Sequence, residues 1–488
     1  MAYGLSKSRL MSFRQCPRRL WLEKHRPDLA VEPPGQQARF DAGHTIGDIA
    51  RRLYDTGGGV LIDYDDGLSA AMRRTQEVLA AAAATPVFEA TFERDGLLVR
   101  ADVLEREPGH SRLVEVKAST SVKPEHVVDC AIQSWVLGAT AVAPDEVALA
   151  FVDNRFTYRG DDRYEGLLVE QELTGEIQPL LEQVPAWVRT ARRILAGDEP
   201  AATIGTRCWT PYECPFRGHC WKPVEHSIAD LPGIGRRLDQ LLAEGHYDLR
   251  ELPEPLASTP DQRRVWRAVR RGTPELSLTA RQEFRGLGFP RFYLDFETIG
   301  LPVPRWAGTR PYQQVPFQWS LHIEGADGDL AHHEFLDLSG EFPVRAAAET
   351  LLSATREAGP VFMYTPFEKT VLGAMAEACP DLRSRLEALV GRLVDLAPIA
   401  RRHYYHPAMR GSWSIKKLLP TIAPELDYSN LAGVRDGTGA QQAYLEAIAP
   451  GTTQARRDDI RRELLAYCGQ DTLGMVQVAR FLEGRRHP

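Results

Sequence analysis

The sequence lacks any long apolar segment and contains little cysteine. No run among its 488 residues approaches the roughly 18 consecutive apolar side chains of a transmembrane helix, and charges scattered through residues 1–28 argue against a secretory signal peptide. Seven cysteines in the whole chain also exclude a disulfide-rich secreted scaffold. We therefore expect a cytoplasmic protein with no membrane partner.

A strong positive charge is missing too. The net charge of -7 argues against a protein that coats nucleic acid and leaves room only for a local basic groove. Basic pairs such as Arg236-Arg237 and Lys416-Lys417 most often lie on solvated helix faces. Because the sequence contains no Walker A loop, the chain supplies no helicase motor of its own.

The patterns that are present predict a multidomain α/β protein. A length of 488 residues predicts about three domains. Residues 1–225 combine helix-like stretches and strand-like runs with a cysteine-rich end. Residues 226–288 have a helical pattern, and strand patterns return in residues 289–488.

The stretch FYLDFETIG, residues 292–300, places two carboxylates inside a run typical of a buried strand. Period-two alternation puts Asp295 and Glu297 on the same face. Two like charges about 4 Å apart repel by roughly 4 kcal/mol at an effective dielectric near 20, so the pair needs a cation, a shared proton or water. Because chance produces about nine acid-x-acid triplets among 66 acidic residues, further acids must decide whether the pair is a site.

Three later acids are candidates to complete such a site. Asp471 falls on the apolar stripe of a C-terminal helix, where a carboxylate is costly unless paired, and Tyr467 lies one turn before it. Glu368 follows the strand-like run VFMY, but the sequence TPFE also fits a capping box with proline at the first helical position. Asp395, at the end of another strand-like run, is the alternative acid.

A second acidic pattern flanks the turn EPGH, residues 107–110. Asp102 lies on the strand-like run before the turn, and Glu115 and Lys117 share one face of the run after it. Metal-dependent phosphodiester hydrolysis uses such a set, because the carboxylates hold a metal that activates water and the lysine stabilises charge. An exposed hairpin with a cross-strand salt bridge explains the pattern equally well.

Four cysteines form a separate pattern. Cys208, Cys214 and Cys220 are evenly spaced within a loop-like segment, and Cys16 lies in a polar turn far upstream. Zinc sites usually contain closer pairs, so an iron–sulphur cluster is the leading interpretation, with zinc and free thiols as alternatives. The other three cysteines lie in apolar helical patterns typical of small buried side chains.

The segment DLPGIGRRLDQLL, which starts at residue 230, resembles a helix-hairpin-helix motif. Gly233 and Gly235 would let the backbone approach a phosphate, and N–H groups at the helix start, together with Arg236 and Arg237, would add to the attraction. A plain helical linker is the alternative.

The N-terminal pattern resembles the PD-(D/E)xK nucleases in Asp102, in EVK at residues 115–117 and in Gln133 on the following helix. One cysteine before this core and three after it resemble the RecB-like iron–sulphur nucleases, over residues 1 to about 222. The resemblance implies a restriction-endonuclease-like fold, metal bound by Asp102 and Glu115, and Gln133 near nucleic acid. It also implies a 4Fe-4S cluster that ties the chain ends together, and action on DNA ends or single strands.

The chain departs from these families at two positions. Leu137 stands where a tyrosine is common, and Gly47 stands where many relatives have a metal-binding histidine, which makes His44 a candidate substitute ligand. Glu89 would assist the site if its strand packs alongside.

The C-terminal motifs Asp295-x-Glu297 and Tyr467-x-x-x-Asp471, with Glu368 between them, resemble those of a DnaQ-like DEDD exonuclease with the RNase H fold. Glu368 stands where the second motif has an aspartate. The resemblance implies two Mg²⁺ or Mn²⁺ ions held by the four acids. It further implies that Tyr467 orients the attacking water and that nucleotides are removed in the 3′ to 5′ direction.

The whole chain resembles bacterial RecB-like nucleases fused to a DnaQ-like domain. GSWSIKKLLP, residues 411–420, is a further signature, in which Lys416 and Lys417 contact the nucleic-acid backbone or face solvent. We expect a metal-dependent nuclease acting on DNA more readily than on RNA, with a separate helicase or a repair or defence complex as partner. Two alternatives stay open: a catalytically silent N-terminal unit that grips nucleic acid, and a non-enzymatic scaffold.

Overall fold

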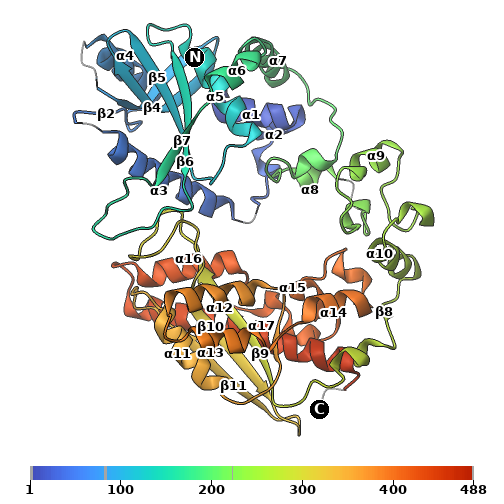
Figure 1. The fold of residues 1–488 in the computed structure, drawn as a ribbon. Coiled ribbons are helices and arrows are strands. Elements are labelled where there is room, and N and C mark those ends of the chain that lie inside the picture. The colour runs from blue at the N-terminus through green and yellow to red at the C-terminus, as the bar shows by residue number, and fades with distance from the viewer. Residues whose placement is uncertain (1–3, 34, 56, 82–84, 222–223, 486–488) are drawn as a thin grey trace. The chain divides into compact units, whose positions relative to one another are not determined.

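The computed structural model describes residues 4–33, 35–55, 57–81, 85–221 and 224–485. The chain divides into two compact units, Met1–Lys222 with Leu301–Tyr312 and Pro223–Gly300 with Gln313–Pro488. Each unit is built on its own β-sheet flanked by helices, so the protein has the expected α/β class (Figure 1).

Two segments group differently from the division expected from the sequence. The segment 226–288 belongs to the second unit and does not stand alone, while residues 301–312, which follow the strand of the acidic pair, belong to the first unit. Backbone hydrogen bonds account for the second assignment. The Gly308 N–H donates to the Tyr158 carbonyl at 2.7 Å.

The first unit contains a seven-stranded sheet. Its strands are β1 (Leu5–Ser6), β2 (Val60–Leu61), β3 (Val87–Arg94), β4 (Leu97–Glu107), β5 (His110–Lys117), β6 (Glu146–Val152) and β7 (Leu168–Glu172). The order is β2-β3-β4-β5-β6-β7, and β1 pairs with β4 in parallel. β3, β4 and β5 are antiparallel, β6 is parallel to β5, and β7 is antiparallel to β6.

Helices cover both faces of this sheet. They are α1 (Lys7–Gln15), α2 (Pro17–His25), α3 (Gln36–Tyr54), α4 (Leu68–Ala80), α5 (Pro124–Leu137), α6 (Thr174–Leu181), α7 (Val184–Ala196) and α8 (Arg217–Cys220). Leu104 and Leu113 belong to the core formed with α1, α5 and α7, whereas Val103 and Val114 belong to the core on the side of α3. Neighbouring residues thus alternate between two faces, as the β-strand period requires.

The second unit contains a five-stranded sheet. Its strands are β9 (Arg291–Ile299), β10 (Val315–Glu324), β11 (Leu330–Leu336), β12 (Val361–Met363) and β13 (Leu393–Asp395). The order is β11-β10-β9-β12-β13. β9, β10 and β11 are antiparallel, and β12 is parallel to both β9 and β13. A small separate sheet pairs β8 (Glu275–Leu276) with β14 (Tyr404–Tyr405).

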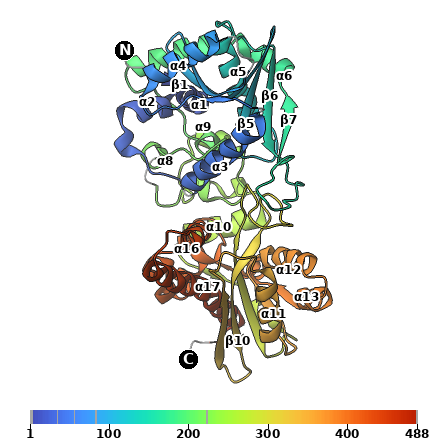
Figure 2. The same ribbon diagram turned by 90° about the vertical axis from the view of Figure 1, so that its left-hand side faces the viewer.

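The helices of the second unit also cover two faces. They are α9 (Arg237–Ala243), α10 (Pro260–Arg271), α11 (Val344–Ala354), α12 (Phe367–Ala378), α13 (Arg383–Val390), α14 (Leu396–His403), α15 (Ile415–Leu418), α16 (Gly437–Ile448) and α17 (Gln454–Glu483). α11, α12 and α13 lie on one side of the sheet and α16 and α17 on the other (Figure 2). α17 spans 30 residues and packs along β9 and β10.

Short 3-10 helices connect these elements. They are η1 (Pro27–Leu29), η2 (Thr206–Cys208), η3 (Ile228–Asp230), η4 (Glu254–Leu256), η5 (Ala280–Phe284), η6 (Pro407–Met409), η7 (Leu419–Thr421), η8 (Pro424–Leu426) and η9 (Tyr428–Asn430). Among the residues that the structure describes, no helix combines the length and the apolar character needed to cross a membrane.

A row of buried polar side chains on β10 holds α17 against the sheet. The row consists of Gln318, Ser320, His322 and Glu324. Gln318 donates to the Leu464 carbonyl at 2.8 Å, and the Ser320 hydroxyl lies 2.8 Å from that of Thr472. Because buried polar groups are costly without partners, these bonds fix which residues of α17 lie over the sheet.

Candidate active site

The acidic pair lies where the central strand of the second sheet extends beyond its neighbour. β12 pairs with β9 only as far as Tyr293, and β9 continues past this ladder with Asp295 and Glu297. On the other side, Ser320 is opposite Asp295 and Gln318 is opposite Glu297. Opposed residues of antiparallel strands share a face, so both carboxylates lie on the face that α17 covers.

Glu368 reaches the pair from the turn after β12. α12 begins at Phe367 with Pro366 as its N-cap and no side-chain cap bond, so the capping box suggested by the sequence does not form. The Glu368 side chain is 3% exposed, and its Oε2 atom has no hydrogen-bond partner among the described residues. The Glu368 and Asp295 carboxyls share a hydrogen bond.

Asp395, the alternative acid, is engaged by the backbone. Its Oδ1 atom accepts the N–H of Thr365 at 3.1 Å and the N–H of Ala397, at the start of α14, at 2.9 Å. Thr365 has a φ of 97°, which β-branched residues rarely adopt. Asp395 therefore supports the strained turn that presents Glu368, and Glu368 is the better placed of the two acids.

Asp471 and Tyr467 approach from α17 and share a hydrogen bond across one helical turn. Asp471 is 7% exposed and accepts a second hydrogen bond from the hydroxyl of Tyr428. The Tyr467 hydroxyl accepts from the Lys416 ammonium at 2.8 Å, and the ammonium lies 4.7 Å from the centre of the Tyr467 ring. Lys417, the neighbour of Lys416, is exposed.

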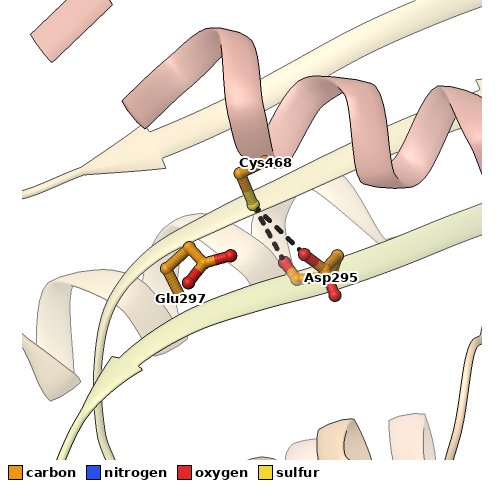
Figure 3. Close-up of side chains that lie close together, drawn as sticks. All are labelled: Asp295, Glu297 and Cys468. Carbon is orange, nitrogen blue, oxygen red and sulfur yellow. Dashed lines mark hydrogen bonds between the residues drawn. The ribbon is translucent and has the colours of Figure 1, made fainter. Parts of the chain in front are cut away.

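Cys468 adds a thiol to the acids. Its Sγ atom lies 3.5 Å from Oδ2 of Asp295 and 3.9 Å from the Asp295 carbonyl oxygen. Asp295, Glu297 and Cys468 each offer a ligand atom within 4.8 Å of the other two. Figure 3 shows Cys468 projecting from α17 toward the strand that carries both acids.

Burial raises the pKa of all four acids, and repulsion between the acids adds to the shift of Asp295, Glu297 and Glu368. Burial, then the charges of Asp471 and Glu368, raise the pKa of Asp295 well above its usual range. Burial, then the charge of Asp471, raises the pKa of Glu297 in the same way. Burial raises the pKa of Glu368 to about 8 and the pKa of Asp471 to about 6. Asp295, Glu297 and Glu368 therefore retain protons near neutral pH until cations replace them.

The second acidic cluster lies in the first unit, where β4 and β5 separate. Their ladder ends at Val103, and beyond it the Asp102 carboxylate accepts the N–H of Val116 at 2.8 Å. β1 pairs with the start of β4. Lys7, the residue that follows β1, thereby reaches Glu115 across 108 positions of sequence.

Two lysines neutralise this cluster. Lys7 donates to Glu115 and to Asp129 at 2.9 Å each. Lys117 donates to the same two carboxylates, at 2.7 Å in the case of Asp129. Gln133 donates to Glu115 at 2.5 Å and to Asp129 at 3.2 Å. The predicted trio thus lies together, within a buried network that also contains Lys7 and Asp129.

Burial and the two lysines together set the pKa shifts in this cluster. Burial raises the pKa of Asp102 to about 7, and the charge of Glu115 adds to the effect. Burial also acts to raise the pKa of Asp129, but the charges of Lys117 and Lys7 outweigh it and hold that pKa below its usual range. Burial acts to lower the pKa of Lys7, but Asp129 and Glu115 raise it overall. The two lysines therefore neutralise Glu115 and Asp129 without a metal.

Two other sequence candidates of the first unit have different surroundings. His44 is exposed on α3. Glu89 forms ion pairs with Arg100 at 3.1 Å and with Arg51 at 3.8 Å. Neither residue is part of the network around Glu115.

The four cysteines singled out in the sequence line one pocket together with four arginines. The cysteines are Cys16, Cys208, Cys214 and Cys220, and the arginines are Arg18, Arg19, Arg207 and Arg217. All four cysteines are free thiols. Burial raises the pKa of the Cys214 thiol to about 11. Residues from the two ends of the first unit thus meet around one set of sulphur donors.

The glycine turn expected in the middle segment is present. Gly233 and Gly235 have φ values of 65° and 51°, and α9 begins at Arg237. Arg236 is exposed, whereas Arg237 donates to the Ser258 hydroxyl at 2.9 Å. One of the two arginines is therefore already engaged by the protein.

A known protein family matches the part of the chain that begins in β9, the strand of the acidic pair. Residues 292–414 match the model of a family described as a domain of unknown function, DUF2779. The matched range contains Asp295, Glu297 and Glu368 but ends before Tyr467 and Asp471. A search of the curated proteins gave no match.

Sequence reasoning missed three residues of these sites. Asp129 lies on the apolar helix α5, so the signal that singled out Asp471 would have found it. Tyr428 lies on a short 3-10 helix without periodicity. Lys7 reaches its partners only through the pairing of β1 with β4, and no local pattern shows this.

Proposed function

We propose that the protein is a metal-dependent nuclease that removes nucleotides from 3′ ends through the acidic cluster of the second unit. The observation that carries this proposal is the convergence of four largely buried acids from three elements. They are Asp295 and Glu297 on β9, Glu368 on α12 and Asp471 on α17. Buried acids are costly without cations. In the described chain, no ion pair joins them to lysine or arginine.

The four carboxylates of the donor set fit hard divalent ions. Carboxylate oxygens are the ligands that Mg²⁺ and Mn²⁺ prefer, and the Oε2 atom of Glu368 is a buried acceptor with no partner in the described chain. When bound, such ions supply the Lewis acidity that activates water and stabilises a leaving 3′ oxygen.

Tyr467 and Lys416 would orient the water. The Lys416 ammonium donates to the Tyr467 hydroxyl, so that hydroxyl directs its own proton to the Asp471 carboxylate and would orient a water bound beside Asp471. Burial, then the charge of Asp471, raises the pKa of Tyr467, which keeps the phenol neutral. Tyr467 therefore acts as a hydrogen-bonding group and not as a base. Tyr428 holds the Asp471 carboxylate in place.

The strand arrangements support the two fold assignments. In the second unit, three antiparallel strands are followed by two parallel ones, with the acidic pair on the central strand, which supports a DnaQ-like, RNase H-like domain. In the first unit, Asp102 on β4, Glu115 and Lys117 on β5 and Gln133 on α5 support a PD-(D/E)xK-like domain.

Lys7 favours a second function for the first unit. Lys7 and Lys117 both bond Glu115 and Asp129, the oxygens that a metal there would need. In this arrangement the lysines take the place of a metal, which favours a first unit that does not cleave nucleic acid. A second nuclease site at Asp102 and Glu115 requires that the Lys7 ammonium move away from the Glu115 carboxylate.

The cysteine pocket fits an iron–sulphur cluster, with zinc as the alternative. Four thiols match the four thiolates that hold such a cluster, and the surrounding arginines offset its negative charge. Anaerobically purified protein should be brown, and Cys214→Ser should lose the colour. Colourless protein that carries zinc would overturn this assignment.

The proposed function is tested by cleavage of end-labelled single- and double-stranded DNA and RNA. Wild type should shorten DNA from the 3′ end with Mg²⁺ or Mn²⁺, Asp295→Ala should not, and Lys117→Ala should retain the activity. Unchanged 3′ to 5′ degradation by Asp295→Ala contradicts the proposal. Binding without cleavage on every substrate favours a scaffold in a repair or defence complex, and cleavage confined to RNA corrects the substrate.

A further inference from the structure

The acidic cluster of the second unit contains a ligand that is not an acid. Cys468 lies on α17, three residues before Asp471, and its side chain is fully buried. The polar row of β10 holds α17 on the sheet on either side of this residue, at Leu464 and Thr472. The position of the thiol relative to Asp295 is therefore set by the fold.

The distance between the donor atoms suits a small tetrahedral ion. Cys468 Sγ lies 3.5 Å from Oδ2 of Asp295. An ion with bonds of about 2.3 Å to sulphur and 2.0 Å to oxygen at a tetrahedral angle separates those two atoms by about 3.5 Å. Glu297 offers a third ligand atom within 4.8 Å of the others (Figure 3).

A second buried group points to a ligand at the same place. The Oε2 atom of Glu368 has no hydrogen-bond partner in the described chain, and the Glu368 carboxyl lies against that of Asp295. A thiol that only donated a hydrogen bond to Asp295 would leave this acceptor unsatisfied. Glu368 is not one of the three residues whose ligand atoms lie within 4.8 Å of one another, so its free oxygen marks a position for a cation on the neighbouring side of the Asp295 carboxyl.

We infer that Cys468 is a metal ligand and that the ion between Asp295 and Glu297 is thiophilic, so that the site prefers Zn²⁺ to Mg²⁺. Carboxylates alone suit Mg²⁺ and Mn²⁺, whereas a thiolate shifts the preference toward Zn²⁺. On binding, a bond forms between the metal and sulphur, the S–H bond breaks, and the proton passes to the buffer. The inference rests on the proposed function only in placing a divalent ion at these acids.

The test compares metal binding by the full-length protein and by Cys468→Ser. Co²⁺ stands in for Zn²⁺, because a cobalt–thiolate bond gives a charge-transfer absorption that carboxylates do not give. The pocket of Cys16 also contains thiols, so the measured quantity is the difference between the two proteins. Cys379→Ser, which removes a buried thiol outside the site, is the matched control.

The expected result is that Cys468→Ser loses part of the charge-transfer band while Cys379→Ser keeps it. The ratio of Zn²⁺ to Mg²⁺ affinity should fall at least about tenfold in Cys468→Ser. Cys468→Ala should behave in the same way, and melting temperatures identify a variant that fails to fold.

Equal spectra and equal affinity ratios in wild type and Cys468→Ser would overturn the inference. The binding readout does not depend on catalysis. A protein whose cobalt–thiolate band decreases in Cys468→Ser but which cleaves no nucleic acid refutes the proposed function and keeps the inference. Cleavage with Mg²⁺, together with an affinity ratio that does not change in Cys468→Ser, keeps the proposed function and refutes the inference.

Discussion

The two acidic clusters differ in what neutralises them. Around Glu115 in the first unit, the carboxylates bond two ammonium groups, those of Lys7 and Lys117. In the second unit, four acids face one ammonium group, that of Lys416, which donates to the Tyr467 hydroxyl and not to a carboxylate. In the first unit the protein's own lysines neutralise Glu115 and Asp129, whereas the acids of the second unit require cations from solution.

This difference shows that the burial of an acid does not by itself indicate a metal site. Asp129 and Asp471 are equally exposed, at 7% each, and both lie on apolar helices. The pKa of Asp129 is lowered by its lysines, whereas burial raises the pKa of Asp471 to about 6. The sign of the pKa shift separates these two acids, but it does not separate the two clusters, because burial and the charge of Glu115 also raise the pKa of Asp102 in the first unit.

The largest expected effect is on catalysis by the four acids of the second unit. Asp471→Asn removes a metal-binding oxygen and should lower the rate of 3′ to 5′ degradation by roughly 10³-fold or more. Asp458→Asn, an exposed change on the same helix, is the matched control and should keep the wild-type rate. A loss of less than about tenfold in Asp471→Asn would remove this residue from the site.

The next effect is a change of stability with opposite signs in the two clusters. Asp129→Asn leaves two buried ammonium groups with one carboxylate fewer, which should cost about 3–5 kcal/mol, the loss typical of a broken buried ion pair. Asp295→Asn removes an acid that must otherwise keep its proton, so the metal-free protein should become more stable. Thermal melts in the presence of a chelator measure both changes. Equal signs would mean that the clusters do not differ as described.

A smaller effect is the dependence of metal-free stability on pH. The pKa of Glu368 is about 8 in the folded chain, whereas an ordinary glutamate has a pKa of 4.5. This raised pKa gives its full stabilisation below about pH 4.5 and loses it as the pH rises to 8, at about 1.4 kcal/mol per pKa unit. The melting temperature in chelator should therefore fall over this range. Glu368→Gln, or added divalent ions, should make the decrease shallower, and an unchanged slope in both would contradict the shift.

The smallest effect separates two adjacent lysines. Lys416→Gln removes the donor to the Tyr467 hydroxyl and should lower kcat by roughly tenfold, because the water is less well oriented. Lys417→Gln changes an exposed residue and should affect only KM, in a salt-dependent way. Steady-state kinetics at two salt concentrations measure both. A kcat loss in Lys417→Gln alone would reverse the two roles.

Sequence patterns predicted those parts of the sites that the local geometry of a strand or a helix determines. The alternation in β9 and the apolar stripe of α17 singled out Asp295, Glu297 and Asp471 because strand and helix periods fix which side chains share a face. The period-two row of polar residues along β10 was equally visible, but its role became evident only when α17 was found to bond it.

Long-range pairing is what the sequence did not reveal. Lys7 joins Glu115 because a two-residue strand pairs in parallel with the start of β4, and such pairings have no local signature. Cys468 fitted a small buried hydrophobe, and it is buried, but its position beside Asp295 depends on how α17 crosses β9. The capping box at TPFE is a valid local pattern that the strained Thr365 turn overrides.

The most direct test of the central claim is a count of Mn²⁺ ions bound per chain, measured by the electron paramagnetic resonance signal of free Mn²⁺. Asp295→Asn should lose bound Mn²⁺, whereas Asp102→Asn should keep the wild-type number, because Lys7 and Lys117 already occupy Glu115, the other carboxylate that a metal at Asp102 would need. Full binding by Asp295→Asn, or a loss confined to Asp102→Asn, would contradict it.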